Sequence, residues 1–392
     1  MRRWLPGLVI LALWIAVLAY RTNGHLLAHS PFDQHTRQAL AWLSGKYWLQ
    51  NTPQWLEVVL QALKGVPREL VSFPPVPTLM ELPWALLFGR YTPNSLVMLI
   101  TTWLALLIVA SVAMRAGSSP WRAWLLSLGF FWGTQIFYLS LDAQVWHQGH
   151  LYGIFFAISG LALASSGSQR YPGTRAALAG FLIALAAGCR PFDLAASAYG
   201  LYLLLATAPK ERRARLAAAF AAGLAIPLAA MGWYNWLRFG EPWEFGHRYL
   251  PWSLQLPKGL FHPIYLRRNL WYAFINLNMD GRGTSLFLTA PFLVFAFASL
   301  FRKGAPRLER ITALGAVSVI FLIQLFHESN GWFQFGYRYS VDVIPVLAIF
   351  VARNLMTPGT SPTWTRFAFG IAALSVLVNF YGAYWFYRLP HQ

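Results

Sequence analysis

Charged side chains are scarce in this sequence. Asp, Glu, Lys and Arg together make up 11% of its 392 residues, whereas hydrophobic residues make up 57%. A soluble domain carries about a quarter charged residues, because water must solvate its surface. The scarcity of charge therefore excludes a soluble globular protein and predicts a membrane protein that crosses the bilayer several times.

Cysteine is nearly absent as well. The single Cys189 excludes an internal disulfide, and no Cys/His spacing typical of structural zinc occurs. The fold therefore depends on neither oxidising conditions nor a structural metal.

Long apolar runs, by contrast, are abundant. The first follows Arg2 and Arg3 like a signal peptide, but no small-residue cleavage site comes after it, so we expect an uncleaved first helix. Several other runs are shorter than the roughly 20 residues that a straight span needs, which predicts broken helices buried in protein. Eleven predicted transmembrane segments cover approximately 5–20, 96–114, 123–139, 151–164, 176–188, 194–208, 216–233, 284–300, 311–326, 343–351 and 367–386.

Acidic residues number 13 against 31 basic ones, which gives a net charge of +18. If 78–88 lies at the interface and does not span, every short basic loop falls on the side of Met1, which the positive-inside rule makes cytoplasmic. Nearly all carboxylates then face the extracytoplasmic side. Topology thus explains the charge without a nucleic acid partner, and chemistry that needs carboxylates is expected outside.

Two long outer loops, 21–94 and 234–283, belong to one integral membrane domain, 1–392, without a separate soluble domain. In the first loop, Ser30, Pro31 and Asp33 have the form of a capping box that starts a helix, and Gly45 supplies its stop. The helix is amphipathic and is expected to lie on the membrane surface. Residues 78–88 predict a second juxtamembrane helix.

Several stretches carry a resemblance to a known family. These are FDQHTRQALAWLSGKYWL (32–49), VSFPPVPTLMELPWALLFG (71–89), WYNWLRFGEPWEFGHRY (233–249) and FGYRYSVDVIPVLA (335–348), supported by CRPFD (189–193) and GRGTSLFLTAPFL (281–293). Their order, after a first helix and a large outer loop, resembles the GT-C superfamily of membrane glycosyltransferases. The resemblance implies an all-α polytopic membrane protein with about eleven transmembrane helices.

The resemblance also implies an activity. Such an enzyme would transfer a sugar, with inversion, from a polyprenyl-phosphate-linked donor to a lipid, glycan or glycolipid acceptor on the extracytoplasmic face. The acidic residue after the first helix falls on Asp33, which would be the general base. Gln34 follows where many members have a second acid, so a divalent metal is possible but not favoured, and no metal ligands are assigned.

Sugar transfer from a lipid phosphate also needs cations for the leaving phosphate. Arg190 lies between two apolar runs, where an arginine usually faces a cavity with a partner, and Asp193 is the nearest carboxylate in sequence. Arg338, with Tyr337 beside it, opens a helix, and its planar guanidinium suits phosphate capture. A structural ion pair remains the alternative for Arg190.

The remaining candidates are polar residues on the outer side, proposed as substrate contacts or acid/base groups. For each, packing at the interface or solvation in a loop is the alternative. They are His147, His150, Glu57, Glu241, Glu244, Asp280 and Arg282.

Two other functions remain open: a flippase or transporter for a lipid-linked sugar, and a non-catalytic membrane assembly subunit. A transporter is expected to place functional charges at mid-membrane and to repeat its halves, and neither feature is seen.

Overall fold

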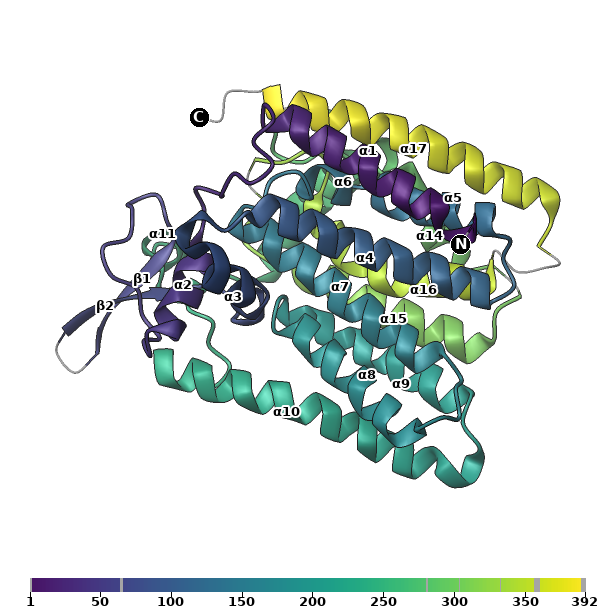
Figure 1. The fold of residues 1–392 in the computed structure, drawn as a ribbon, viewed down its shortest axis with the longest axis horizontal. Helices are drawn as coiled ribbons and strands as arrows, with labels where there is room; N and C mark the ends of the chain where they lie inside the picture. Colours follow the sequence, from purple (N-terminus) through teal and green to yellow (C-terminus); the bar gives the residue numbers. More distant parts are fainter. Residues whose placement is uncertain are drawn as a thin grey trace.

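The computed structural model describes residues 2–63, 66–279, 281–302, 304–331, 333–355 and 360–388. Helices run roughly side by side in one elongated bundle, and a small β-hairpin extends from one end (Figure 1). The N-terminus lies at the end opposite to the hairpin, and the C-terminal helix finishes at the hairpin end. The protein is mostly helical, as the sequence predicts.

The predicted apolar segments all coincide with helices. These are α1 (Leu5–Arg21), α4 (Asn94–Arg115), α5 (Pro120–Phe131), α6 (Ile136–Leu139), α7 (Val145–Ser165), α8 (Pro172–Ala187), α9 (Ala196–Ala206), α10 (Arg213–Phe239), α13 (Leu286–Thr289), α14 (Pro291–Ser299), α15 (Arg307–Leu325), α16 (Ile344–Asn354) and α17 (Pro362–Arg388). Two segments, 123–139 and 284–300, are each broken into two helices. The break at Ala290 precedes Pro291, which cannot continue the hydrogen bonding of the helix before it.

Four helical stretches are long and apolar enough to cross a bilayer by themselves: 94–115, 210–239, 307–325 and 362–388. With the shorter apolar helices they make a multi-pass membrane protein. Of the shorter helices, α16 is buried along most of its length, whereas α1 exposes Leu5, Leu8, Val9 and Leu13.

Small residues bring α8 and α10 into close contact. A Cβ atom built on Gly223 would lie 1.9 Å from the carbonyl oxygen of Ala177, and one on Gly180 would lie 2.1 Å from that of Phe220. Both positions therefore require glycine. Close approach of backbones through small residues is how membrane helices gain packing energy without a hydrophobic driving force.

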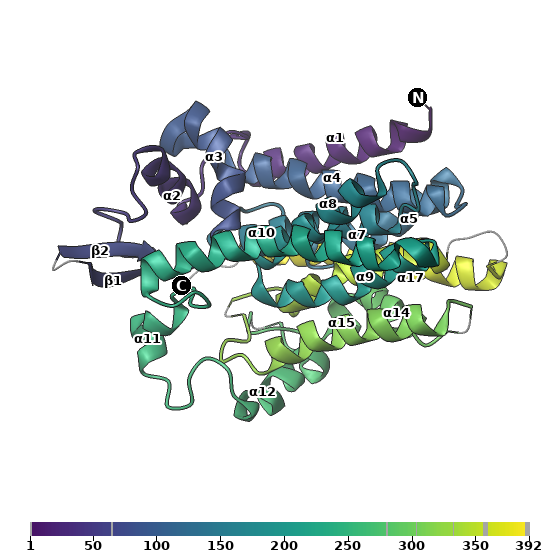
Figure 2. The same cartoon turned by 90° about the horizontal axis from the view of Figure 1, so that it is seen from below.

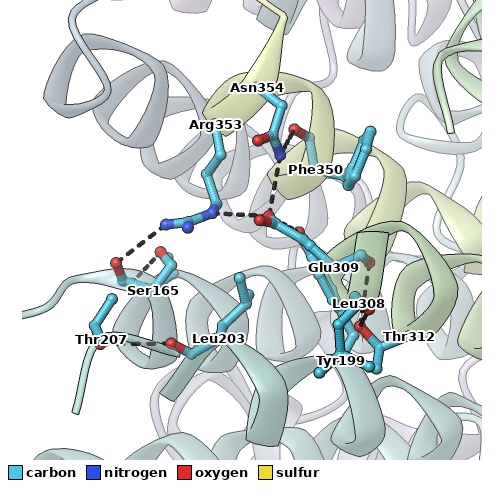
Figure 3. A network of polar contacts seen from close by, with 11 residues as sticks. Ser165, Tyr199, Leu203, Thr207, Leu308, Glu309, Thr312, Phe350, Arg353 and Asn354 are labelled. Carbon is cyan, nitrogen blue, oxygen red and sulfur yellow. Dashed lines mark hydrogen bonds and ion pairs between the residues drawn. The ribbon is translucent and has the colours of Figure 1, made fainter. Parts of the chain in front are cut away.

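A buried acidic residue connects three helices directly, and a fourth through Arg353 (Figure 3). Glu309 of α15 is 2% exposed, and its Oε1 accepts hydrogen bonds from Tyr199 of α9 (3.1 Å), Arg353 (3.2 Å) and Asn354 (3.0 Å) of α16. Arg353 also donates to the carbonyl of Ser165 in α7. The charges neutralise each other, so their burial is tolerated.

The hairpin end carries the parts of the first loop. Helices α2 (Gln34–Leu43) and α3 (Val76–Phe88), strands β1 (Val58–Leu63) and β2 (Val66–Val71), and α11 (Pro251–Leu254) of the second loop gather there (Figures 1 and 2). Helix α12 (Leu266–Leu270) follows α11 in the chain. The two predicted juxtamembrane helices are present, whereas the hairpin departs from the expected all-helical chain.

The start of α2 differs from the predicted capping box. The helix begins at Gln34, and the carboxylate of Asp33 makes no cap hydrogen bond because it pairs instead with Arg37 one turn later. The hydroxyl of Ser30 accepts from the N–H of Phe32. The predicted stop is confirmed: Gly45 has a φ of +71°, and the N–H of Lys46 reaches the carbonyl of Ala41, which is a Schellman motif.

A buried carboxyl group anchors α3. Glu81 accepts from the hydroxyl of Tyr152 in α7 at 2.6 Å and from Asn94 of α4 at 2.8 Å, and Asn94 also donates to Thr36 of α2. Asn94 of α4 thus holds both α2, through Thr36, and α3, through Glu81, against the bundle.

Candidate functional site

A cavity of about 840 Å³ opens at the hairpin end. Its wall is contributed by α2, the segment before α3, the start of α7, the turn between α8 and α9, the second loop and the residues that follow α15. Such a volume is typical of sites for small molecules or cofactors. Aromatic residues of the wall include Phe73, Trp146, Phe192, Trp243, Phe245, Phe261 and Tyr339.

Asp342 is the centre of a hydrogen-bond network behind this wall. It lies in the 3₁₀ turn Arg338–Val343 and accepts from Nδ1 of His150 (2.5 Å), Nε of Arg190 (3.1 Å) and Nε2 of Gln324 (2.7 Å). The side chain of Asp342 is fully buried, whereas that of Arg190 is 20% exposed and lines the cavity. The network thus holds a guanidinium at the cavity wall.

The partner of Arg190 is therefore Asp342 and not Asp193, the carboxylate nearest in sequence. The guanidinium carbon of Arg190 lies 4.8 Å from the ring centroid of Phe192 and 5.4 Å from that of Tyr339. Both carboxylate oxygens of Asp193 are buried and make no hydrogen bond to the described residues.

Arg338 also lines the cavity, and its positive charge acts on the nearby carboxyl group of Glu57, whose pKa it lowers against the larger effect of burial. It is 6% exposed, and no carboxylate among the described residues forms an ion pair with it. Its Nε has no hydrogen-bond partner there either. The predicted helix opening at Arg338 is present as a 3₁₀ turn, but the neighbour that lines the cavity is Tyr339, whereas Tyr337 lies in the core. A buried guanidinium that makes no direct ion pair can accept an anionic ligand, because a direct ionic partner offsets the cost of burying its charge.

Of the two predicted histidines, only His150 lines the cavity. His147 is 1% exposed, and its Nδ1 lies 2.7 Å from the carbonyl oxygen of Asp142.

The acidic candidates are divided in the same way. Glu244 lines the cavity and pairs with Arg248 at 2.6 Å. Glu57 stands behind Trp146, whose Nε1 donates to it at 3.1 Å, and burial raises the pKa of Glu57. Glu241 and Arg282 are not among the residues that line the cavity, and Asp280 lies outside the described residues.

Asp33 is not among the residues of the cavity wall. It is 2% exposed, and its Oδ1 lies 2.6 Å from Nε of Arg37. Phe32 beside it packs against the cavity residue Trp146, with ring centroids 5.2 Å apart. Asp33 therefore adjoins the cavity, and its catalytic role stays a prediction.

Three further histidines line the cavity, and the sequence analysis did not single them out: His35, His247 and His327. Burial, with nearby positive charges, lowers the pKa of His35 and of His247 to about 3 and that of His327 to about 4. All three rings are therefore neutral at physiological pH. His35 and His247 lie within two of the stretches that carry the family resemblance, 32–49 and 233–249. That location is the only feature of the sequence that pointed to them.

Within the described parts of the chain, no three His, Cys, Asp or Glu side chains are grouped so as to hold a metal ion.

Comparisons with known proteins identify the fold. The chain matches no protein-family model and no curated protein. It is similar in structure to ArnT from Cupriavidus metallidurans bound to undecaprenyl phosphate, with a TM-score of 0.53 and 15% identity over 91% of this chain and 61% of ArnT. It is also similar to the oligosaccharyltransferase of Archaeoglobus fulgidus in the apo form, with a TM-score of 0.52 and 13% identity over 97% of this chain and 56% of the other. The chain thus spans about three fifths of the length of these two proteins.

Proposed function

The chain has a GT-C superfamily fold, and on that premise we propose that it transfers a sugar from a polyprenyl-phosphate-linked donor to an acceptor on the extracytoplasmic face of the membrane. The acceptor would be a lipid, glycan or glycolipid. The observation that carries this proposal is the unpaired, buried guanidinium of Arg338 in a cavity that Arg190 also lines.

Arg190 and Arg338 suit a lipid phosphate. Arg190 is held at Nε by Asp342, and its two terminal amino groups make no hydrogen bond to the described residues. Arg338 offers a second cation, which forms no direct ion pair with the described residues. Guanidinium groups bind phosphate oxygens through paired, charge-assisted hydrogen bonds, which are strong where water is excluded. The undecaprenyl phosphate bound by ArnT supports the same class of ligand here.

The cavity also has apolar residues for a prenyl chain. Trp243, Leu254 and Phe261 belong to its wall, and they are 70%, 69% and 49% exposed, respectively. Large exposed apolar groups beside a cavity are typical of a surface that meets lipid or an apolar ligand. We propose that the prenyl chain lies along these residues.

The proposed topology has eleven spans, a cytoplasmic N-terminus and a cavity on the extracytoplasmic side. Two observations support it. The basic loops lie with the N-terminus, and the N-terminus and the hairpin are at opposite ends of the bundle (Figure 1). Membrane lipids would surround the bundle.

In the proposed reaction, the acceptor hydroxyl attacks the anomeric carbon of the donor sugar, and the bond from that carbon to the phosphate oxygen breaks. Asp33 takes the hydroxyl proton, and the bonding electrons leave with the polyprenyl phosphate. Arg190 and Arg338 stabilise the negative charge that develops on it. A single displacement inverts the anomeric centre.

Arg338→Gln tests the phosphate site. We expect the variant to bind undecaprenyl phosphate at least tenfold more weakly, because a charge-assisted hydrogen bond contributes about 1.5–3 kcal/mol. Binding is measured by titrating the purified protein in nanodiscs. Arg90→Gln, at an exposed position, is the matched control and should bind as the wild type does. Equal affinity of the Arg338 variant and the wild type would refute the assignment.

A further inference from the structure

The cavity has two regions that differ in charge. The Arg190 and Arg338 region offers cations to a ligand. The cation whose charge acts on His35 of α2 is Arg238, which is 1% exposed and does not line the cavity. Its two terminal amino groups already donate to the carbonyls of Val71 and Phe73 and to Asn235. Glu244 and Arg248, which also line the cavity, pair with each other at 2.6 Å. The wall around His35 therefore suits a neutral part of a ligand.

Aromatic rings and two imidazoles form this uncharged part of the wall. The ring of Phe73 stands between His35 and His247, with centroid distances of 6.1 and 5.0 Å. Trp146 also belongs to the cavity wall, beside Phe32 of the segment that starts α2. Aromatic rings provide apolar faces for the C–H faces of a sugar, whereas the sugar hydroxyls need hydrogen-bonding partners.

His35 has one ring nitrogen available for such a bond. Its Nδ1 lies 3.0 Å from the hydroxyl oxygen of Thr78, and Nε2 makes no hydrogen bond to the described residues. The hydroxyl of Thr78 has no other hydrogen-bond partner there, so donating its proton to Nδ1 satisfies it. That assignment puts the proton of the neutral ring on Nε2.

The ring keeps this form across the physiological range. Burial and the charge of Arg238 lower the pKa of His35 to about 3, so the imidazole stays neutral above pH 5. A neutral imidazole of this kind is a hydrogen-bond donor through one nitrogen, and a hydroxyl oxygen is a suitable acceptor.

We propose that His35 is a sugar-binding residue: its Nε2–H donates to a hydroxyl of the sugar being transferred, while Thr78 fixes the tautomer and Phe73 packs against the ring. This inference rests on the proposed function, because a sugar joined to a phosphate at Arg190 and Arg338 extends into the same cavity. It assigns to α2 a specificity-determining contact in addition to the proposed base.

The test compares His35→Leu, which has no donor, with His35→Gln, which keeps an N–H donor on a side chain of similar length. Donors are undecaprenyl phosphate linked to radiolabelled glucose, galactose, mannose or arabinose, and inner-membrane lipid extract is the acceptor source. We expect His35→Leu to lower kcat/KM about tenfold or more for the best donor. His35→Gln should recover much of that loss, and Thr78→Val should show an intermediate loss. His25→Leu, at an exposed position away from the cavity, is the matched control.

Deoxy donors identify the contact. Among 2-, 3-, 4- and 6-deoxy forms of the best sugar, one should lower kcat/KM of the wild type about as much as His35→Leu does. The same deoxy donor should cause no further loss in His35→Leu, because partners in one hydrogen bond are not additive. Additive losses for every deoxy donor, or equal losses in His35→Gln and His35→Leu, would overturn the inference.

Two controls separate this inference from the proposed function. Undecaprenyl phosphate binding by His35→Leu should match the wild type and confirms that the variant is folded. If the wild type transfers a sugar and His35→Leu does so equally well, only the role of His35 fails. If the wild type transfers none of the four sugars, the proposed function fails and this inference fails with it.

Discussion

Asp342 shows how a single buried residue orients the cavity. Its two oxygens receive donors from His150, Arg190 and Gln324, so the carboxylate is satisfied although it is fully buried. Because Asp342 holds only Nε of Arg190, the two terminal amino groups remain available toward the cavity. The ion pair therefore positions Arg190 and leaves its terminal amino groups free for the ligand proposed above.

Asp33→Asn, a change at a single residue, tests the proposed general base. We expect kcat for sugar transfer to fall about 10²–10⁴-fold, since general base catalysis contributes a factor of that order. Affinity for undecaprenyl phosphate should be unchanged, because Asp33 is not in the phosphate region. Transfer from a radiolabelled donor measures kcat, and Glu69→Gln is the carboxylate control. Wild-type turnover by the Asn variant would rule out Asp33 as the base.

The sequence predicted the residue types of the site better than their pairings. Arg190 was identified because a cation between two apolar runs is unusual, and Arg338 because it opens a helix and its planar guanidinium suits phosphate capture. The partnership of Arg190 with Asp342 joins residues 152 positions apart, and no local spacing encodes such a contact. His35 and His327 were missed for the same reason, since only the folded chain brings them to one cavity.

At the scale of elements, helix α2 buries polar side chains and exposes an apolar one, the reverse of the usual amphipathic arrangement. Its polar residues Gln34, Thr36 and Gln38 are buried against the protein, whereas Leu43 is 46% exposed. Periodicity predicted the helix and its stop at Gly45, because both depend on local sequence. It did not predict which face turns inward, because that depends on partners such as Asn94 in α4. The hairpin was missed because it lies in a loop without a long apolar run.

Glu81 should stabilise the attachment of α2 and α3. In Glu81→Leu, Tyr152 and Asn94 each lose a buried acceptor, so the free energy of unfolding should fall by about 2 kcal/mol or more. Thermal unfolding in detergent measures the change, with Glu328→Leu, a partly exposed position, as the control. An unaltered melting temperature would contradict the role of Glu81.

The same residue predicts a pH dependence. Burial raises the pKa of Glu81 from 4.5 to about 7 in the folded chain. Between these values the folded state binds more protons than the unfolded state, so this contribution to stability decreases as the pH rises. The side chain in Glu81→Gln does not titrate. In this variant the melting temperature should no longer fall with rising pH between pH 5 and 8 because of this residue. A slope equal to that of the wild type would show that another group titrates.

At the scale of the whole molecule, opposite ends of the bundle should face opposite compartments. Gln50→Cys, in the loop before the hairpin, should react with a membrane-impermeant maleimide on intact spheroplasts. Arg212→Cys, at the exposed start of the 210–239 stretch, should react only after permeabilisation. Labelling is read on a gel. The native Cys189 is 1% exposed, so the wild-type protein should not react and serves as the control. The reverse labelling pattern would invert the proposed topology.

The polar contacts at both ends of α15 and α16 bear on the choice between an enzyme and a carrier. Gln324 and Asp342 join the two helices beside the cavity, and Glu309 and Arg353 join them at the far end. A carrier that works by alternating access must separate one end of such a pair while the other closes. Here both ends are fastened by buried hydrogen bonds, so rocking would expose unpaired charges. This pair of helices suits a stationary scaffold, in which the substrates move and the cavity does not.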